Sequence, residues 1–249
     1  MIERFLPIAA SAQASDLDAV LRAVHVHMAV QAVAWGLFFV YCLVRFRRGA
    51  HPKASHVGLS PTVPLLAIAL VVIGDAVLLA TSAVPVWLRR ATPPDALSRP
   101  LEVHVTAEQF AWNIHYPGPD GKFGRTSSAL ISAANPVGID RASPDGQDDI
   151  GLLNILTVPV GRPVVVQLTS RDVVHSFTLN EMRVRQDATP GLLVHTWFTP
   201  TTAGHWEIAC SQLCGLGHYR MRGAINVLAE GEWAQWLQRE VALIAPPGR

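Results

Sequence analysis

Residues 210–221 read CSQLCGLGHYRM and place four metal-type side chains in one loop between two β-type runs. These side chains are Cys210, Cys214, His218 and Met221. Thiolate, imidazole and thioether groups are donors that suit copper. Two glycines within the loop allow it to curl tightly. The segment therefore predicts a metal site that one loop of a β domain presents.

A fifth donor lies upstream, where DVVHSF places His175 at the edge of another predicted strand. Two thiolates, two imidazoles and a thioether suit two copper ions better than one. Three simpler interpretations remain open at this point. A Cys2His2 zinc site would leave Met221 without a role. Alternatively, Cys210 and Cys214 pair as a disulfide outside the cell, or the histidines are ordinary polar core residues.

The chain from residue 92 onward alternates short β-type runs with turn residues, which is typical of an all-β sandwich or barrel. The predicted strands are residues 101–107, 110–116, 155–159, 162–169, 176–180, 193–198, 205–209 and 223–228. Residues 127–149 are rich in turn formers and acids, and we expect a surface excursion there. Residues 230–244 repeat large apolar side chains at helical spacing, which predicts an amphipathic terminal helix. Its apolar face consists of Trp233, Trp236, Leu237 and Val241.

The first third of the chain holds two stretches long and apolar enough to cross a bilayer. One comprises residues 23–44, and the other lies between His56 and Arg89 with prolines near its ends. The connection between them is basic, through Arg45, Arg47, Arg48 and Lys53. Basic connections favour the cytoplasmic side, so both termini and the metal loop are expected outside.

Polar residues interrupt both spans. His25, His27 and Gln31 lie toward one end of the first span, where we expect them near the interface or facing protein. Asp75 lies in the apolar centre of the second span. An ionised carboxylate is unfavourable in hydrocarbon, so Asp75 should face a partner helix, remain protonated or find a donor. If the lipid boundary is drawn differently, Asp75 lies close to an interface instead.

The chain thus divides into three parts: an extracytoplasmic segment at residues 1–22, a transmembrane helix hairpin at residues 23–91, and a β domain with its terminal helix at residues 92–249. The first part has a basic residue, a short apolar run and small residues that resemble a signal-peptide cleavage site. Its apolar core is short for a signal peptide, and cleavage stays open.

Composition excludes several classes of function. The net charge is +1 and neither sign forms a long run, so no nucleic-acid surface and no polybasic membrane patch is expected. Three cysteines cannot build a disulfide framework, and Cys42 sits among apolar residues away from the loop. The functional chemistry is therefore expected at one local site.

The motifs HSF, ATPG and CSQLCGLGHYRM, following a two-span hairpin, resemble subunit II of haem-copper cytochrome c oxidases. The resemblance covers nearly the whole chain and implies a cupredoxin-like Greek-key barrel that holds a dinuclear copper A centre. In that arrangement Cys210 and Cys214 bridge both coppers. His175 and Met221 complete one ion, and His218 with the backbone carbonyl of Gln212 completes the other.

The sequence also departs from the family. Many relatives carry a glutamate where this chain has Gln212, and its carboxylate reaches a magnesium ion at the subunit interface. A neutral amide is a poorer magnesium ligand, so that second metal is in doubt. Relatives also carry a surface tryptophan that receives the electron. Here EQFAWNIHY places Phe110 at that position and Trp112 two residues on, so both are expected on the same strand face and either ring is a candidate first acceptor at the surface near the copper. Alternatively, both are half-buried aromatic residues of the sheet.

Two further family features are missing from the sequence. No glutamate for a proton path occurs around residues 58–63, and no Cys-x-x-Cys-His motif for a fused cytochrome c domain occurs. A separate cytochrome c is therefore the implied donor. Acidic residues near the site, namely Asp172, Glu181 or Asp187, are expected to steer a basic cytochrome.

The resemblance implies a subunit of a proton-translocating oxidoreductase in the bacterial cytoplasmic (inner) membrane, with the copper domain on the periplasmic side and lipid around the spans. The chain would accept electrons from cytochrome c and pass them to a haem-bearing subunit I, which reduces oxygen; further oxidase subunits are expected. Two alternatives come from other classes. One is a structural subunit of a quinol oxidase without a redox role, and the other is a membrane-anchored copper carrier.

Overall fold

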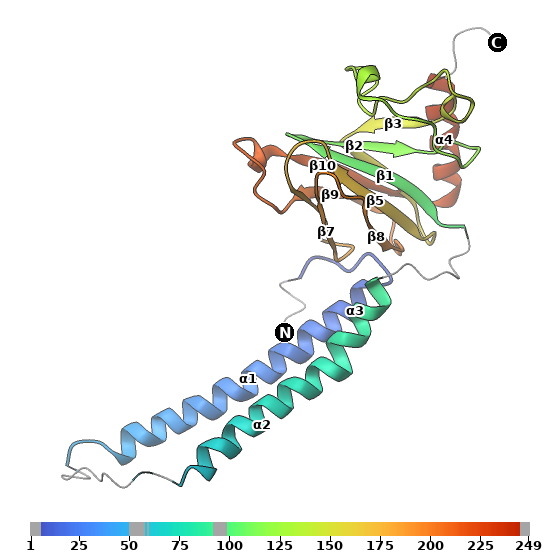
Figure 1. Cartoon of the computed structure of the whole chain (residues 1–249). Helices are drawn as coiled ribbons and strands as arrows, with labels where there is room; N and C mark the ends of the chain where they lie inside the picture. Colours follow the sequence, from blue (N-terminus) through green and yellow to red (C-terminus); the bar gives the residue numbers. More distant parts are fainter. Residues whose placement is uncertain (1–5, 50–57, 59, 92–98, 245–249) are drawn as a thin grey trace. The chain divides into compact units, whose positions relative to one another are not determined.

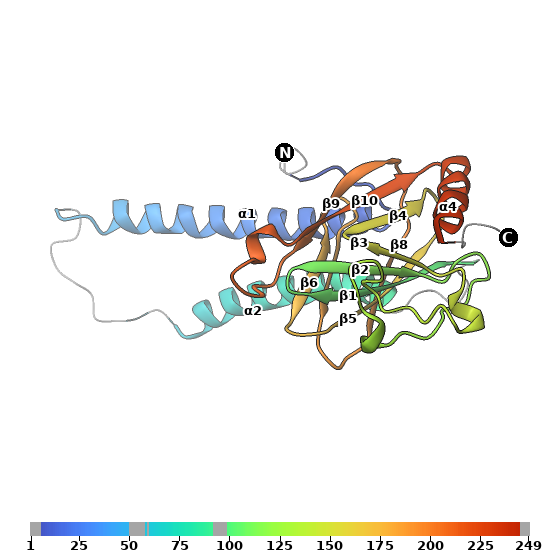
Figure 2. The ribbon, with the colours of Figure 1, turned by 90° about the horizontal axis from the view of Figure 1, so that it is seen from above.

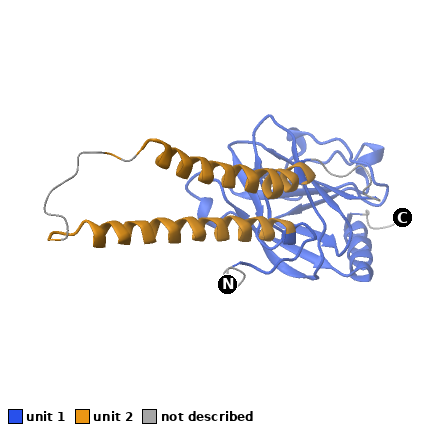
Figure 3. Cartoon of the chain, turned by 90° about the horizontal axis from the view of Figure 1, so that it is seen from below, with its two compact units in different colours: residues 1, 3–15, 90–249 blue, residues 2, 16–89 orange. Residues whose placement is uncertain are grey.

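The computed structural model describes residues 6–49, 58, 60–91 and 99–244. Two compact units divide the chain: a helical unit formed by Asp16–Arg89, and a β unit that joins the residues before Asp16 to those after Arg89 (Figure 3). The segment preceding the first span thus belongs to the β unit and not to the hairpin.

The helical unit contains two helices long and apolar enough to cross a membrane. The first is α1 (Ala14–Arg45), and the second runs through α2 (Thr62–Leu78), the π-helical turn η2 (Leu79–Ala83) and α3 (Val84–Ala91). The π turn ends two residues before Pro85. Proline lacks the N–H of a normal helical hydrogen bond, and a wider turn accommodates the ring without ending the helix.

Asp75 finds its donor within the same unit. Its Oδ1 lies 2.7 Å from Nε2 of His27 on α1, and Gln31 Nε2 lies 3.5 Å from the same oxygen. Gly74 makes this approach possible, because a Cβ at that position would lie 3.0 Å from His27 Cε1. The expectation that Asp75 would need a polar partner is confirmed, and the partner comes from the neighbouring helix.

The β unit is a sandwich of two five-stranded sheets, visible as two layers in Figures 1 and 2. One sheet has the order β3-β2-β1-β5-β8, with strands β1 (Leu101–Glu108), β2 (Ala111–Tyr116), β3 (Ile150–Leu153), β5 (Val164–Ser170) and β8 (Val194–Phe198). The other has the order β4-β10-β9-β6-β7, with strands β4 (Ile155–Pro159), β6 (His175–Leu179), β7 (Val184–Ala188), β9 (Gly204–Cys210) and β10 (Arg222–Leu228). The pairs β1–β5 and β4–β10 are parallel. The predicted cupredoxin-like domain is confirmed.

Alternating burial explains why these runs form strands. In β1 every second side chain faces the core, and β5 repeats this pattern in parallel register with it. All eight predicted strands are present with ends that differ by at most two residues. The strands β3 and β7 were not predicted, because they are short and carry turn-like or charged residues.

The terminal helix α4 (Glu230–Ile244) packs with its predicted apolar face against the sheets. Trp233 and Trp236 are buried and stack on each other at a centroid distance of 4.7 Å. Tyr116 meets Trp236 edge to face at 5.4 Å and donates its hydroxyl hydrogen to the carbonyl of Thr157. Buried aromatics with satisfied polar ends fix the helix on the sandwich.

The excursion at residues 127–149 is less superficial than expected. Ile139 and Asp149 are fully buried, so the prediction of a purely surface segment is wrong for these positions. Asp149 Oδ2 lies 2.6 Å from His115 Nε2 on β2 and accepts the N–H of Gly124 at 2.8 Å. This carboxylate ties the excursion to the sheet, a long-range contact that local composition does not reveal.

The segment before α1 forms a strap on the β unit. Ala10 donates its N–H to the carbonyl of Glu181 and accepts from the N–H of Thr201, and Ser11 donates its hydroxyl hydrogen to the carbonyl of Met182. Ala10 and Ser11 are both buried. The boundary predicted at residue 22 therefore lies within α1, while the residues just before α1 pack as part of the β unit.

Candidate metal centre

Three strand ends bring the predicted donors together. β9 runs antiparallel to both β6 and β10, so the start of β6, the end of β9 and the start of β10 lie at the same end of one sheet. His175 opens β6, Cys210 closes β9, and Met221 directly precedes β10. Cys214 and His218 occupy the loop between β9 and β10. Antiparallel pairing is therefore what places His175 beside a loop that follows it by more than thirty residues.

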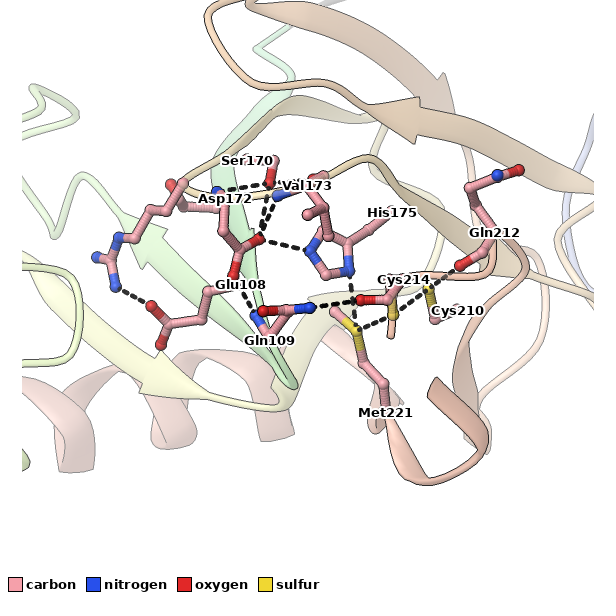
Figure 4. A network of polar contacts seen from close by, with 12 residues as sticks. Glu108, Gln109, Ser170, Asp172, Val173, His175, Cys210, Gln212, Cys214 and Met221 are labelled. Carbon is pink, nitrogen blue, oxygen red and sulfur yellow. Dashed lines mark hydrogen bonds and ion pairs between the residues drawn. The ribbon is translucent and has the colours of Figure 1, made fainter. Parts of the chain in front are cut away.

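The donor atoms lie within contact distance of one another (Figure 4). Sγ of Cys210 and Sγ of Cys214 are 3.8 Å apart. Met221 Sδ lies 3.7 Å from Cys214 Sγ and 3.1 Å from His175 Nδ1. The sulfur pair thus has an imidazole and a thioether on one side.

The other two predicted donors approach the sulfur pair separately. His218 Nδ1 lies 3.5 Å from Cys214 Sγ, and the backbone oxygen of Gln212 lies 3.2 Å from Cys210 Sγ. His175, Cys210 and Cys214 form a cluster in which all donor atoms are within 4.8 Å of one another, whereas His218 falls outside it. The two imidazoles therefore do not converge on one point, as a single tetrahedral ion would require.

Asp172 orients His175. Its Oδ1 lies 2.9 Å from His175 Nε2, which leaves Nδ1 directed at the sulfur atoms. Asp172 Oδ2 accepts the backbone N–H of Gln109 at 2.6 Å, and its Oδ1 accepts the N–H of Val173 at 2.7 Å. A carboxylate on the far nitrogen of an imidazole is the usual support of a metal-binding histidine.

The environment makes the two thiols unequal. Burial opposes ionisation of Cys210, but hydrogen bonds from His175 and from backbone groups outweigh it and lower its pKa to about 6. Burial, together with the neighbouring charge of Cys210, raises the pKa of Cys214 to about 12. Burial likewise opposes the charge on His175, yet its contacts with Cys210 and Asp172 raise its pKa. One thiolate is therefore available at neutral pH, and a bound cation would favour the second.

The donor set fits copper better than the simpler alternatives. Met221 is 1% exposed and touches both His175 and Cys214, so the thioether belongs to the cluster. Thioether ligands are typical of copper and not of structural zinc. Cys210 and Cys214 are free thiols in the structure, and their separation far exceeds a disulfide length of about 2.05 Å.

The two candidate first acceptors lie in different environments. Phe110 is half-buried in the turn before β2, under the loop glycines, where a Cβ on Gly217 would overlap its ring. Trp112 is fully buried, 6.2 Å from the His175 ring between centroids. The expectation that both rings share a surface face is wrong, because the strand begins only at Ala111. Trp112 lies beneath the centre, and Phe110 lies at its outer edge.

The remaining histidines of the β unit serve other contacts. His115 pairs with the buried Asp149, His205 lies 2.8 Å from the side-chain oxygen of Asn226, and His195 is exposed on β8. His104 stacks on Phe123 with a centroid distance of 3.7 Å. Three of these four histidines thus make contacts with residues other than the metal donors.

Gln109 has a supporting role at the site that was not predicted from the sequence. Its Nε2 donates to the backbone oxygen of Cys214 at 2.7 Å, and its backbone N–H donates to Asp172. It therefore joins the turn that carries Phe110 to both ligand-bearing segments (Figure 4). No local pattern marks this role, because the contact joins residues far apart in the sequence.

Comparison with known proteins identifies relatives over most of the chain. A family model described as "Cytochrome C oxidase subunit II, periplasmic domain" matches residues 102–228. The alternative cytochrome c oxidase subunit 2 of Bradyrhizobium diazoefficiens is 36% identical over 218 residues, which cover 86% of this chain and 76% of that protein. Cytochrome c oxidase subunit 2 of Cereibacter sphaeroides is 33% identical over 167 residues, which cover 62% of this chain and 53% of that protein.

Among solved structures, the periplasmic domain of subunit II of cytochrome oxidase (CoxB) of Bradyrhizobium japonicum is similar to this chain. It is 31% identical and matches with a TM-score of 0.44, covering 60% of this chain and 99% of that one.

Proposed function

Because the chain belongs to the cytochrome c oxidase subunit II family, we propose that it accepts electrons from cytochrome c at a dinuclear copper centre and delivers them to a haem-bearing subunit I. The observation that carries this proposal is the arrangement of donors around Cys210 and Cys214. His175 and Met221 approach from one side, whereas His218 and the Gln212 carbonyl approach separately.

In the proposed centre the thiolates of Cys210 and Cys214 would hold two copper ions. When bound, such a pair spreads one electron over both metals, so the geometry changes little when an electron arrives or leaves. The protein supplies positioning. The β sheet fixes both ends of the ligand loop, and Asp172 holds His175 in the ring orientation that the metal requires.

The chain is proposed to act within a complex. Oxygen reduction and the coupled proton translocation need haems, and these fall to subunit I and further oxidase subunits. We place the two apolar helices in the bacterial inner membrane, surrounded by lipid, with the β unit on the periplasmic side. Gln212 offers its carbonyl to copper, and its amide side chain is a weak magnesium ligand.

An electron paramagnetic resonance spectrum of the full chain in detergent, loaded with copper, tests the proposal. The expected signal shows one unpaired electron shared by two copper nuclei, with two copper ions per chain by elemental analysis. His218→Gln should distort or abolish that signal while the β unit keeps its thermal transition.

Three other results would contradict the proposal. Zinc, or a lone mononuclear copper, in the purified chain would remove the dinuclear centre. Rapid exchange of copper with a chelator, together with purification free of any haem subunit, would favour a copper carrier. Quinol oxidation by a complex whose chain binds no copper would favour a structural subunit.

A further inference from the structure

The loop that carries Cys214 and His218 exposes large apolar side chains beside the metal ligands. Leu216 is 98% exposed and Tyr219 is 75% exposed. Both lie within five residues of Cys214, and His218 between them is only half-buried. Exposed large apolar side chains that gather on one surface are typical of a contact site.

The backbone forces Leu216 outward. The glycines on either side of it pack against Phe110: a Cβ on Gly215 would lie 3.2 Å from the Phe110 ring, and a Cβ on Gly217 would overlap that ring. Because the loop backbone lies flat on Phe110, the side chain between the two glycines points away from it. We define the loop patch as Phe110, Leu216 and Tyr219.

Three carboxylates on or next to the strands that lead into the loop patch already have partners. Glu108 pairs with Arg171 at 2.7 Å, and Glu207 pairs with Arg222 at 3.2 Å. Asp172 is bound by His175 and by the N–H of Gln109. Asp172 was expected to attract a basic cytochrome. It instead orients the metal ligand His175.

The other two predicted acids belong to segments other than the metal loop. Glu181 lies after β6, where its carbonyl accepts from the N-terminal strap. Asp187 is exposed on β7, but Arg185 lies two residues away and therefore on the same face of that strand. Arg220 lies over the Phe110 ring with its Cζ 5.9 Å from the centroid, so a cation borders the patch directly.

Resting on the proposed function, we infer that the loop patch is the docking surface for a cytochrome c whose haem edge is ringed by apolar residues and not by lysines. An apolar donor surface would bury Leu216 and Tyr219 beside His218 and thus approach the centre closely. A lysine-ringed donor would bring like charges against Arg220, which disfavours docking. Contact by burial of apolar surface depends little on ionic strength.

The test uses the assembled oxidase and two purified cytochromes c, one with a lysine-ringed haem edge and one with an apolar edge. Binding is measured by surface plasmon resonance, and electron delivery by stopped flow. Over the range in which the Debye length falls from about 30 Å to about 8 Å, the rate constant with the apolar donor should change less than about twofold. The substitution Leu216→Ser should raise the Kd of the apolar donor for the oxidase about tenfold.

Leu243→Ser provides the matched control, because Leu243 is 79% exposed on α4 and should leave the Kd unchanged. Wild-type affinity in Leu216→Ser would overturn the inference, as would a rate that falls steeply with salt or favours the lysine-ringed donor. Loss of the haem subunit from purified Leu216→Ser would assign the patch to a subunit contact instead. These outcomes are separate from the proposed function, since the copper signal of the same preparations reports that independently.

Discussion

The side-chain amide of Gln109 donates a hydrogen bond of 2.7 Å to the backbone oxygen of Cys214. The turn before β2 and the metal loop, which are distant in sequence, are thereby held together at the edge of the centre. The same residue donates its backbone N–H to Asp172, so one position serves both ligand segments.

Gln109→Leu should loosen the metal loop without unfolding the sandwich. The substitution keeps a branched side chain of similar bulk but removes a hydrogen bond worth about 0.5–1.5 kcal/mol. We expect altered copper hyperfine splitting and a thermal transition that shifts by only a few degrees. Gln147→Leu, at an exposed position in the excursion, is the control. An unchanged spectrum in Gln109→Leu would show that the loop needs no support from this contact.

Asp172→Ala should weaken metal binding, because His175 would lose the carboxylate that fixes its ring. Loss of such a supporting carboxylate typically lowers metal affinity by about 10–100-fold. Asp172→Asn retains an oxygen acceptor, so its copper affinity should lie between that of Asp172→Ala and that of the wild type. Copper affinity is measured by competition with a chelator of known stability. Equal affinity in all three proteins would mean that β6 alone positions His175.

Gln212→Ala should leave copper loading intact. The proposed ligand at this position is the backbone oxygen, 3.2 Å from Cys210 Sγ, which any residue retains. Elemental analysis and the resonance spectrum provide the measurement. Loss of one copper per chain would show instead that the amide side chain participates.

The sequence was sufficient for the strands that carry regular alternation. It also indicated the donors of the metal loop, because soft donors at short spacing signal their chemistry locally, whereas the role of the Gln212 carbonyl was implied only by the family resemblance. It was insufficient where a role depends on tertiary contact. The burial of Trp112 and the pairing of Asp149 with His115 both arise from residues brought together across the sandwich. Gln109 belongs to the same class, since nothing in its neighbours specifies a contact with Cys214.

The stability of the β unit should depend on pH through His104. Burial, together with the neighbouring His115, lowers the pKa of His104 from 6.5 to about 4, so the folded form favours the neutral ring. The unfolded chain then binds more protons between these values, and stability is lost as the pH falls from 6.5 toward 4. Partial solvent contact limits the effect to on the order of 2 kcal/mol.

His104→Gln should flatten this part of the pH profile, as measured by urea unfolding of the full chain in detergent at several pH values. Above pH 6.5 the contribution of His104 to the free energy of unfolding is constant. The plots of this free energy against pH should therefore be parallel for the variant and the wild type in that range. The same slope in both proteins below pH 6.5 would assign the acid sensitivity to other groups.

The contact between His27 and Asp75 should stabilise the helical unit. Their side chains are 2.7 Å apart, and Asp75 retains 51% of its side-chain exposure within this chain. Polar contacts between membrane helices contribute about 0.6 kcal/mol on average and at most about 1.7 kcal/mol. The pair should therefore show a modest coupling energy in a double-mutant cycle.

The cycle compares His27→Leu, Asp75→Leu and the double variant by unfolding the full chain in graded mixtures of mild detergent and SDS. If the two residues act as a pair, the double variant should be no less stable than the weaker single variant, because neither polar group is left alone in an apolar setting. Leu66→Ala, a lipid-exposed position on α2, controls for loss of apolar surface. Fully additive losses would indicate that each residue acts through a separate contact.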